Sequence, residues 1–452
     1  MSIVFNNLAR TLVLGATATL LAFGTSPAQA AAKIQRVISP GGIEAWLVQD
    51  ATVPLAAMQF AFQGGSAQDP ADKPGVAQLM ADNLDEGAGD LDSSAYHERL
   101  ERRAIQMNFT VTRDHIRGSL RMLKDNRDEA FDLLRLALTA PRFDAEPLER
   151  VRGQTLSILR RESVTPGSIA SEKFFAAGFP NHPYAHSPRG TLASIPTIGA
   201  DDLRAYREKV FTKAGLTVAV VGDIAPDALG QLLDKTFGAL PAKGNLAPVP
   251  DATMATGDGR VFVPLDVPQT NILFGAPSIK RSDPDFMAAY IVNHIIGGGS
   301  LSSRLYHEVR EKRGLVYSVS TSLWWMDKTS IFLGSTATRA DRANETADRI
   351  ASELKRIAEE GPTQQELDEA KSYLKGSQMV ALDSSTKFAG ALLQYQIDKL
   401  GIDYLDRRPA IIDAVTLDDA KRVAKKIWSH QLLTVSVGRP PAEAATPKPI
   451  KN

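Results

Sequence analysis

The chain has 452 residues, with 52 basic and 52 acidic side chains and no cysteine. Balanced charge gives no reason to expect a nucleic acid or a membrane surface as a partner. The lack of cysteine excludes disulfides and thiolate metal ligands. This length exceeds what one hydrophobic core usually holds, so we expect two or more domains.

Residues 1–30 are typical of a secretory signal peptide. Arg10 supplies a positive charge, residues 11–23 form a short apolar stretch, and Ala28-Gln29-Ala30 fits the small-residue rule for cleavage. A buried N-terminal helix is the alternative, which the terminal position and the cleavage site disfavour. We therefore expect a periplasmic or otherwise exported protein. No later segment is a continuous apolar stretch of about eighteen residues, so we expect no membrane span after cleavage.

Residues 33–240 are predicted to form a first domain of mixed strands and helices. Alternating apolar positions predict strands over residues 43–49 and 56–63. Apolar positions at helical spacing predict helices over residues 73–84 and 144–161. Runs of strands with helices beside them favour an α+β fold with a mostly antiparallel sheet.

Residues 241–259 are predicted to be a linker, because they are rich in Pro, Gly and Ala and have no regular periodicity. A second domain is expected over residues 260–440, followed by a tail of residues 441–452. Its predicted elements are strands over 270–276 and 317–323 and helices over 302–313, 340–360 and 362–382.

The two halves of the chain repeat one another. Similar short motifs recur at an offset of about 217 to 219 residues. The matching pairs are Leu148 with Leu367, Asp202 with Asp419, and Leu216 with Leu433. Three offsets that agree this closely indicate two homologous domains.

Residues 297–320 are the most informative stretch. They begin with a glycine triplet and continue as a helix with Leu301, Leu305 and Val309 on one face, which Gly314 is in position to cap. The candidate functional residues are Gly297, Gly298, Gly299, Arg310 near the helix end, and Tyr317 at the start of the next strand.

This stretch resembles the C-terminal half of the M16 zinc peptidases, the family of pitrilysin, insulin-degrading enzyme and mitochondrial processing peptidase. In that family the matching Arg and Tyr hold the substrate in the active site. The resemblance covers essentially the whole mature chain. It implies an α+β fold of two homologous LuxS/MPP-like domains, each a mostly antiparallel sheet with helices packed on it, which together form half of a clam-shell.

Without the resemblance, Arg310 would be interpreted as part of a surface ion pair and Tyr317 as a half-buried core residue. The resemblance instead implies that both hold substrate. A guanidinium and a phenol O–H in a water-poor cleft can bind the substrate backbone or a developing oxyanion. The glycine triplet can let another chain approach closely, although a flexible turn is the alternative. Residues 107–111 resemble the substrate-pairing edge strand of the family, which would place Asn108 beside a bound peptide.

M16 enzymes hold zinc through H-x-x-E-H on one helix and a distant Glu. Two His one helical turn apart can share a Zn²⁺, and the Glu between them acts as general base. By this resemblance Gln78 and Asp82 stand at the two His, Ala81 at the base and Ile158 at the distant Glu. No H-x-x-E-H occurs anywhere in the sequence. We therefore expect no metal and no cofactor in this chain.

These residues predict a non-catalytic subunit of an exported heterodimeric M16-type zinc peptidase. The expected partner is a zinc-bearing M16 subunit with an intact motif, to which this chain lends Arg310 and Tyr317, and the expected substrate is an unstructured peptide. One alternative is a structural or assembly subunit of the same fold. Another is a periplasmic peptide-binding protein that acts alone. An enzyme active by itself has the least support, because the zinc ligands are absent.

Overall fold

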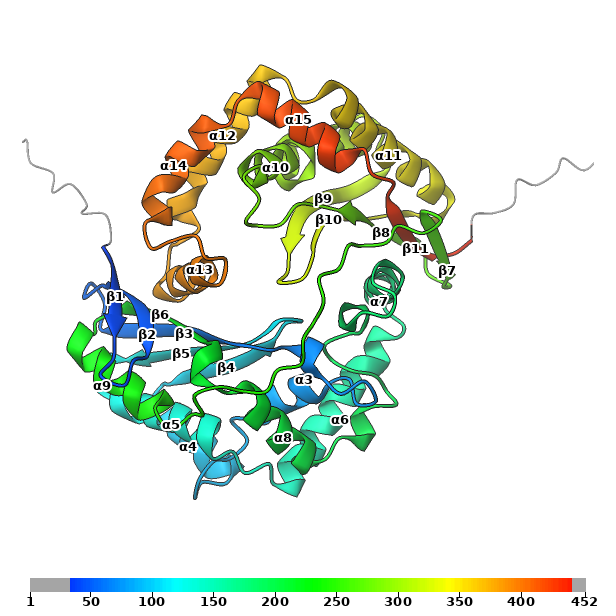
Figure 1. The fold of residues 1–452 in the computed structure, drawn as a ribbon. Coiled ribbons are helices and arrows are strands. Elements are labelled where there is room, and N and C mark those ends of the chain that lie inside the picture. The colour runs from blue at the N-terminus through cyan, green and yellow to red at the C-terminus, as the bar shows by residue number, and fades with distance from the viewer. Residues whose placement is uncertain (1–32, 441–452) are drawn as a thin grey trace, which may run out of the picture.

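The structure, a computed structural model, describes residues 33–440. The predicted signal peptide and the predicted tail lie outside the described residues. Two sheets face each other across the middle of the molecule, and helices cover their outer sides (Figure 1). The predicted α+β fold with two domains of one kind is confirmed. No helix in the described part of the chain is long and apolar enough to cross a membrane.

The first sheet has six strands in the order β1-β2-β6-β3-β5-β4. Neighbouring strands are antiparallel except for β2 and β6, which run parallel. The strands are β1 (Ile34–Ile38), β2 (Glu44–Gln49), β3 (Leu55–Gln63), β4 (Gln106–Val111), β5 (His115–Leu123) and β6 (Leu216–Gly222). Strand β4 is therefore the last strand at one edge.

The second sheet has five strands in the order β7-β11-β8-β10-β9. These are β7 (Arg260–Pro264), β8 (Gln269–Pro277), β9 (Val316–Trp325), β10 (Ser330–Arg339) and β11 (Leu433–Gly438). Only β7 and β11 run parallel in this sheet. Its order and directions match those of β2-β6-β3-β5-β4, so β9 corresponds to β4. The topology thus repeats, as the sequence offsets predict.

Between residues 33 and 440, seven α-helices belong to the first half and six to the second. Those of the first half are α3 (Val76–Ala81), α4 (Ser93–Arg102), α5 (Arg127–Thr139), α6 (Ala145–Glu162), α7 (Pro166–Gly178), α8 (Ala200–Val210) and α9 (Pro226–Phe237). Those of the second half are α10 (Phe286–Asn293), α11 (Ala343–Glu360), α12 (Gln364–Val380), α13 (Ser385–Ile397), α14 (Tyr404–Ala414) and α15 (Leu417–Trp428). Each half builds its main core between its own sheet and the helices on the outer side.

The two halves also exchange one helix each. Helix α7 of the first half packs on β8 and β11 of the second sheet, and α13 of the second half packs on β3 and β6 of the first. Leu392 and Leu393 of α13 lie in one apolar cluster with Trp46 and Val48 of β2. Apolar residues of α7 cluster in the same way with strand β11. Each sheet is therefore covered on its inner side by a helix from the other half.

Candidate functional site

Helix α3 carries the residues that stand at the zinc positions of the family. It begins after Gly75, whose φ is +102°, and Asp69 accepts hydrogen bonds from the N–H groups of Gly75 at 2.7 Å and Ala77 at 2.9 Å. Burial raises the pKa of Asp69 to about 7, against the effect of these two donors. The helix starts later than the predicted 73–84 because of the left-handed turn at Gly75, and it ends at Ala81, where residues 82–85 form turns.

Gln78 and Asp82 bond to each other rather than to a third group. The amide Nε2 of Gln78 donates to Oδ1 of Asp82 at 2.8 Å. Burial raises the pKa of Asp82, and the bond from Gln78 and the charge of Arg189 offset this only in part. Ala81 is buried, and Ile158 is half-buried on the neighbouring helix α6. The four positions thus supply one carboxylate and no imidazole.

These residues do not fit a zinc ion. A zinc site needs three or four nitrogen, sulfur or carboxylate ligands in tetrahedral order, whereas an amide, a methyl group, a carboxylate and a branched hydrocarbon provide one strong ligand. Across residues 33–440, no group of three or more His, Asp or Glu side chains is placed to hold a metal ion.

The acidic residues that follow α3 make structural contacts. Glu86 accepts hydrogen bonds from Arg150 of α6 at 3.1 and 2.5 Å and from the Ser93 hydroxyl at 2.5 Å. Burial alone would raise the pKa of Glu86, but these bonds outweigh it and lower the pKa. Burial raises the pKa of Asp85, which lies near His97. The Glu86 contacts tie the segment after α3 to α6.

Arg310 and Tyr317 lie together at the end of a π-helical segment, η8 (Tyr306–Glu311). The guanidinium carbon of Arg310 is 4.9 Å from the centre of the Tyr306 ring and 6.0 Å from that of Tyr317. Both distances lie within cation–π range. Tyr317 is 86% exposed. Arg310 has no acidic partner among the residues that the structure describes, so the pair is available to a ligand.

Sequence reasoning missed Tyr306. Its position four residues before Arg310 places both on one side of a helical segment, and this spacing could have identified it.

Gly314 has a φ of +59° and its N–H donates to the Arg310 carbonyl at 2.8 Å, so the predicted cap is confirmed. Leu301 is 67% exposed, whereas Leu305 and Val309 are fully buried, so the prediction that these three residues share one face is wrong. Leu301 lies within a short turn, η7 (Ser300–Ser302), which begins with a left-handed residue and precedes η8.

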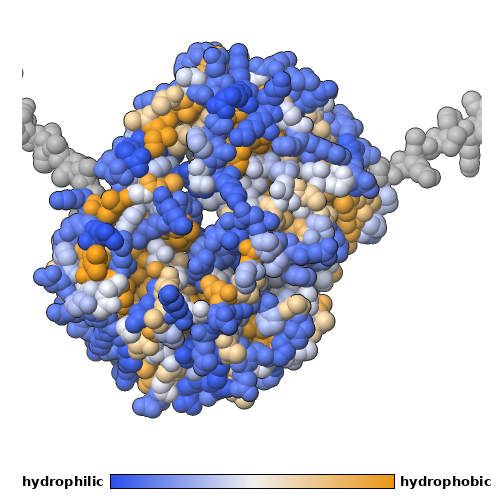
Figure 2. Space-filling model, in the orientation of Figure 1, coloured by the Kyte–Doolittle hydropathy of each residue, from blue (hydrophilic) through white to orange (hydrophobic). Residues whose placement is uncertain are grey.

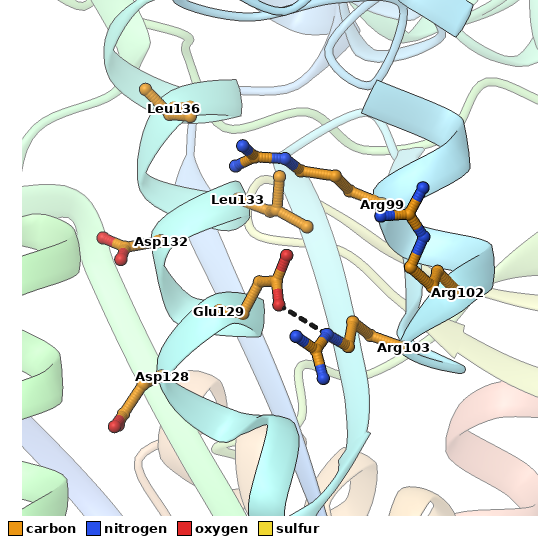
Figure 3. Close-up of a pocket in the computed structure, with 8 residues that line it drawn as sticks. All are labelled: Arg99, Arg102, Arg103, Asp128, Glu129, Asp132, Leu133 and Leu136. Carbon is orange, nitrogen blue, oxygen red and sulfur yellow. Dashed lines mark ion pairs between the residues drawn. The ribbon is translucent and has the colours of Figure 1, made fainter. Parts of the chain in front are cut away.

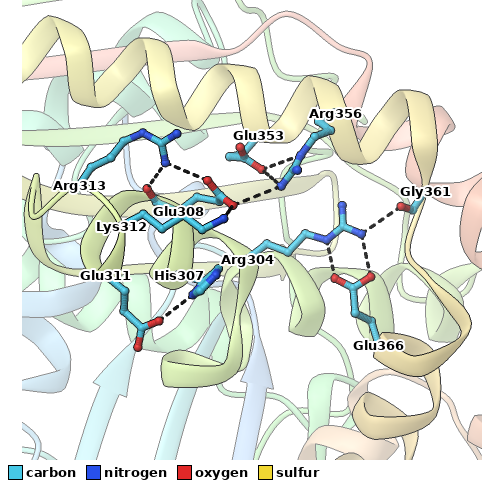
Figure 4. Close-up of polar contacts among 10 residues, drawn as sticks. All are labelled: Arg304, His307, Glu308, Glu311, Lys312, Arg313, Glu353, Arg356, Gly361 and Glu366. Atoms are coloured by element: carbon cyan, nitrogen blue, oxygen red, sulfur yellow. Dashed lines mark hydrogen bonds and ion pairs between the residues drawn. The ribbon is translucent and has the colours of Figure 1, made fainter.

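Glu308 anchors η8 from the side opposite to solvent. Its side chain is 9% exposed and accepts hydrogen bonds from Lys312 at 2.7 Å and Arg313 at 2.8 Å. Burial opposes ionisation, yet these two cations lower the pKa of Glu308 to about 2. Arg356 of α11 comes within 3.8 Å of the same carboxylate and also pairs with Glu353 (Figure 4). The segment that carries Arg310 is thereby fixed to α11.

Arg304 makes a second anchor, to α12. Its guanidinium donates to both carboxylate oxygens of Glu366 at 2.6 and 2.7 Å and to the carbonyl of Gly361 at 3.2 Å (Figure 4). A bidentate pair fixes orientation as well as distance. Together with the Glu308 contacts, it leaves the η8 backbone little freedom to move beneath Arg310.

The glycine triplet packs closely against strand β9. It spans the end of a second π-helical segment, η6 (His294–Gly298). Gly297 is buried, and a Cβ there would lie 2.6 Å from Oγ1 of Thr321. A Cβ on Gly298 would lie 2.9 Å from Nδ2 of Asn293, and one on Gly299 would lie 2.9 Å from the His294 carbonyl. The missing side chains let η6 approach β9, and Gly298 keeps an exposed surface.

Asn108 lies in the edge strand β4 and pairs with Ser119 of β5. Its side chain is exposed, as are those of Gln106 and Thr110 on the same face. Helix α3 contacts β4, η1 (Ser66–Gln68), α6 and α8, whereas η8 contacts β9, α11 and η7. The structure therefore holds the degenerate helix and the Arg–Tyr pair in separate halves, each next to the free edge of its own sheet.

A cavity of about 350 Å³ lies elsewhere, between α4 and α5 (Figure 3). Three basic and three acidic side chains line it, and Arg103 pairs with Glu129 at 2.8 Å. Because the basic and acidic side chains are equal in number, this cavity shows no preference for a ligand of either charge. Hydrophilic residues also dominate the face seen in Figure 2, with apolar residues in small groups.

Comparisons with known proteins match both halves. The profile of the family described as Insulinase (Peptidase family M16) matches residues 45–191, and that described as Peptidase M16 inactive domain matches residues 197–374. The Non-peptidase homolog YmxG of Helicobacter pylori is 29% identical over 77% of this chain and 81% of its own. The Uncharacterized zinc protease YmxG of Bacillus subtilis is 23% identical over 78% and 85%.

Solved structures show the same fold. The crystal structure of a peptidase M16 inactive domain from Pseudomonas fluorescens superposes with a TM-score of 0.83 at 28% identity, covering 90% of this chain and 98% of that one. A protease from Helicobacter pylori superposes with a TM-score of 0.81 at 20% identity, over 90% and 99% of the two chains.

Proposed function

The chain belongs to peptidase family M16, and we propose that it is a non-catalytic subunit of an exported two-chain zinc peptidase. One observation carries this proposal. The exposed Tyr317 and the half-buried Arg310 lie together on an anchored segment, while Gln78, Ala81 and Asp82 provide no zinc site in the same chain. A side-chain pair suited to holding a substrate is kept, and the residues needed for hydrolysis are not.

The partner in this proposal is an M16 subunit with an intact H-x-x-E-H motif and its zinc ion. The substrate is an unstructured peptide, which such a chain can present as an added strand along the free edge of a sheet. The guanidinium of Arg310 and the hydroxyl of Tyr317 would then donate to the peptide backbone or to the oxygen that gains negative charge during hydrolysis. Export rests on the signal-like residues 1–30.

A structural or assembly subunit is the second candidate. The names of relatives do not decide between them, because one is called a non-peptidase homolog and another an uncharacterized zinc protease. An exposed tyrosine near an arginine that pairs with no acid within residues 33–440 leaves hydrogen-bond donors for a peptide, which an assembly role by itself does not require. We therefore favour the substrate-holding role.

The proposal is tested by mixing the purified chain with candidate partner subunits. The mature chain is purified, its metal content is measured after dialysis, and it is assayed on an unstructured fluorogenic peptide alone and with the H-x-x-E-H chains encoded in the same genome. We expect no bound zinc and no turnover alone, and chelator-sensitive turnover with one partner. Robust turnover by this chain alone would contradict the proposal, and a partner equally active without it would favour the assembly role.

A further inference from the structure

A second cavity, of about 240 Å³, lies in the second half where α10, α12, α13 and α14 meet. None of the residues placed in the candidate site lines it. Ala381, which is exposed, forms part of its wall, so the cavity opens to solvent there. Its aromatic lining consists of Phe286, Tyr290, Trp325, Tyr395 and Tyr404.

Arg281 lies among these rings. Its guanidinium carbon is 4.2 Å from the centre of the Phe286 ring and 5.4 Å from that of Tyr404, and it donates to the Tyr404 hydroxyl at 2.8 Å. It also lies 3.8 Å from the carboxylate of Asp398, whose side chain is 7% exposed. The charge of Arg281 is thus compensated within the wall.

Asp398 is already engaged by neighbours within the wall. Its oxygens accept from the indole N–H of Trp325 at 3.1 Å and from the amide of Gln394 at 2.8 Å, in addition to the contact with Arg281. This carboxylate is a structural member of the wall.

Unlike Arg281, Arg408 of α14 contacts only neutral acceptors in the described part of the chain. One of its nitrogens donates to the carbonyl of Leu374 at 2.9 Å and to Oε1 of Gln378 at 3.0 Å, and both acceptors are neutral. Within residues 33–440 no acidic side chain pairs with it. The adjacent Arg407, by contrast, pairs with Asp403 at 2.7 Å and does not line the cavity. The cavity therefore carries one uncompensated positive charge beside an aromatic lining.

We propose that this cavity binds a ligand with a flat apolar body and a carboxylate. The body lies among the rings, which offer large apolar faces, and the carboxylate pairs with Arg408, whose planar fork suits it. The volume is below the roughly 300–1,000 Å³ of sites for drug-sized molecules, so a single aromatic amino-acid unit fits the size. Such a unit is either a free aromatic acid or the last residue of a peptide. The inference is independent of the proposed function.

The first test compares N-acetyl-L-phenylalanine with its amide by isothermal titration calorimetry on the mature chain. We expect the acid to bind with a Kd of about 1 mM or tighter and the amide at least about tenfold more weakly. A tripeptide that ends in phenylalanine, with a free or an amidated C-terminus, separates the two sources. Binding of the free-ended tripeptide identifies a peptide C-terminus, and binding of the small acid alone identifies a free acid.

Variants locate the binding. Arg408→Gln should weaken binding of the acid by about tenfold or more and leave the amide unchanged, whereas Arg407→Gln, the same change one residue earlier, should have no effect. Ser377→Trp fills the cavity from α12 without removing a charge and should abolish binding of the acid, and it keeps the test decisive if Arg408→Gln does not fold. Equal binding of acid and amide, equal effects of the two arginine changes, no binding of the acid, or full binding to folded Ser377→Trp would each overturn the proposal.

Discussion

Single residues decide how firmly the Arg310–Tyr317 pair is held. The rings of Tyr306 and Tyr317 both lie near the Arg310 guanidinium, and the buried Glu308 forms ion pairs with Lys312 and Arg313. A buried carboxylate without such partners would be costly. The ion pairs therefore explain how a buried acid is tolerated in the segment that carries Arg310.

Glu308→Gln should lower the free energy of unfolding at neutral pH by about 2–4 kcal/mol, because two cations lose their buried partner. The pKa of Glu308 in the folded state, about 2, lies below the ordinary value near 4.3. Its contribution is therefore present above that value and is lost as the pH falls from about 5 to about 2. Urea unfolding at a series of pH values measures this.

The matched control is Glu311→Gln, one turn further along. Glu311 is 47% exposed and pairs with His307, so its replacement should change stability by less than about 1 kcal/mol. Equal losses for the two variants at neutral pH, or a Glu308 effect that does not shrink in acid, would show that Glu308 is not the anchor described above.

At the scale of elements, two π-helical segments flank the edge strand β9. Segment η6 brings the glycine triplet against Thr321, and η8 presents Arg310 next to Tyr317. π-Helical turns are rare and are frequent at functional sites. Here they adjust the approach of two helical segments to one strand.

Gly297→Ala should destabilise the protein by about 1–3 kcal/mol, because the added Cβ meets Oγ1 and Cγ2 of Thr321. Adding Thr321→Ala removes both atoms, so the double variant should be more stable than the sum of the single effects predicts. Gly376→Ala is the control: nothing lies within 4 Å of its Cβ position in α12, and the change should be neutral or stabilising. Strictly additive effects of Gly297→Ala and Thr321→Ala in thermal unfolding would contradict this packing role.

Much of this arrangement could be predicted from the sequence, for identifiable reasons. Strand β3 and helix α6 lie within two residues of their predicted bounds, because alternating and helical apolar patterns are local signals. The start of α3 and the π-helical form of η8 could not be predicted, since both depend on close packing between segments distant in sequence. The Gln78–Asp82 bond and the stacking of Tyr306 likewise depend on side-chain geometry that no spacing specifies.

On the scale of the whole molecule, the exchange of α7 and α13 joins the two halves. Sequence offsets reveal the repeat, but an apolar helix face does not tell which sheet it covers. The hairpin between β9 and β10 adds a polar contact, because the Asp327 N–H donates to Asp114 at 3.1 Å and the Lys328 N–H donates to Tyr184 at 3.2 Å. The halves are thus held together by apolar and polar contacts.

Leu392→Ala in α13 should destabilise the first sheet, although the residue belongs to the second half. The side chain is fully buried in the cluster with Trp46 and Val48, and such truncations cost about 2–5 kcal/mol. In hydrogen exchange, β3 and β6 should lose protection before β8 and β10. Leu354→Ala, in the second core, should give the opposite order. Protection lost first in the second sheet in both variants would show that α13 does not support the first.

The central claim, that this chain supplies a substrate-holding pair to a partner's zinc site, is tested most directly by one measurement. It is kcat/KM of the two-chain enzyme with Tyr317→Phe and with Arg310→Ala, after light scattering confirms assembly. Loss of one oxyanion donor typically costs about 3 kcal/mol, so we predict a roughly hundredfold fall for Tyr317→Phe and at least as much for Arg310→Ala. Assembled variants that cleave at the wild-type rate would contradict the claim.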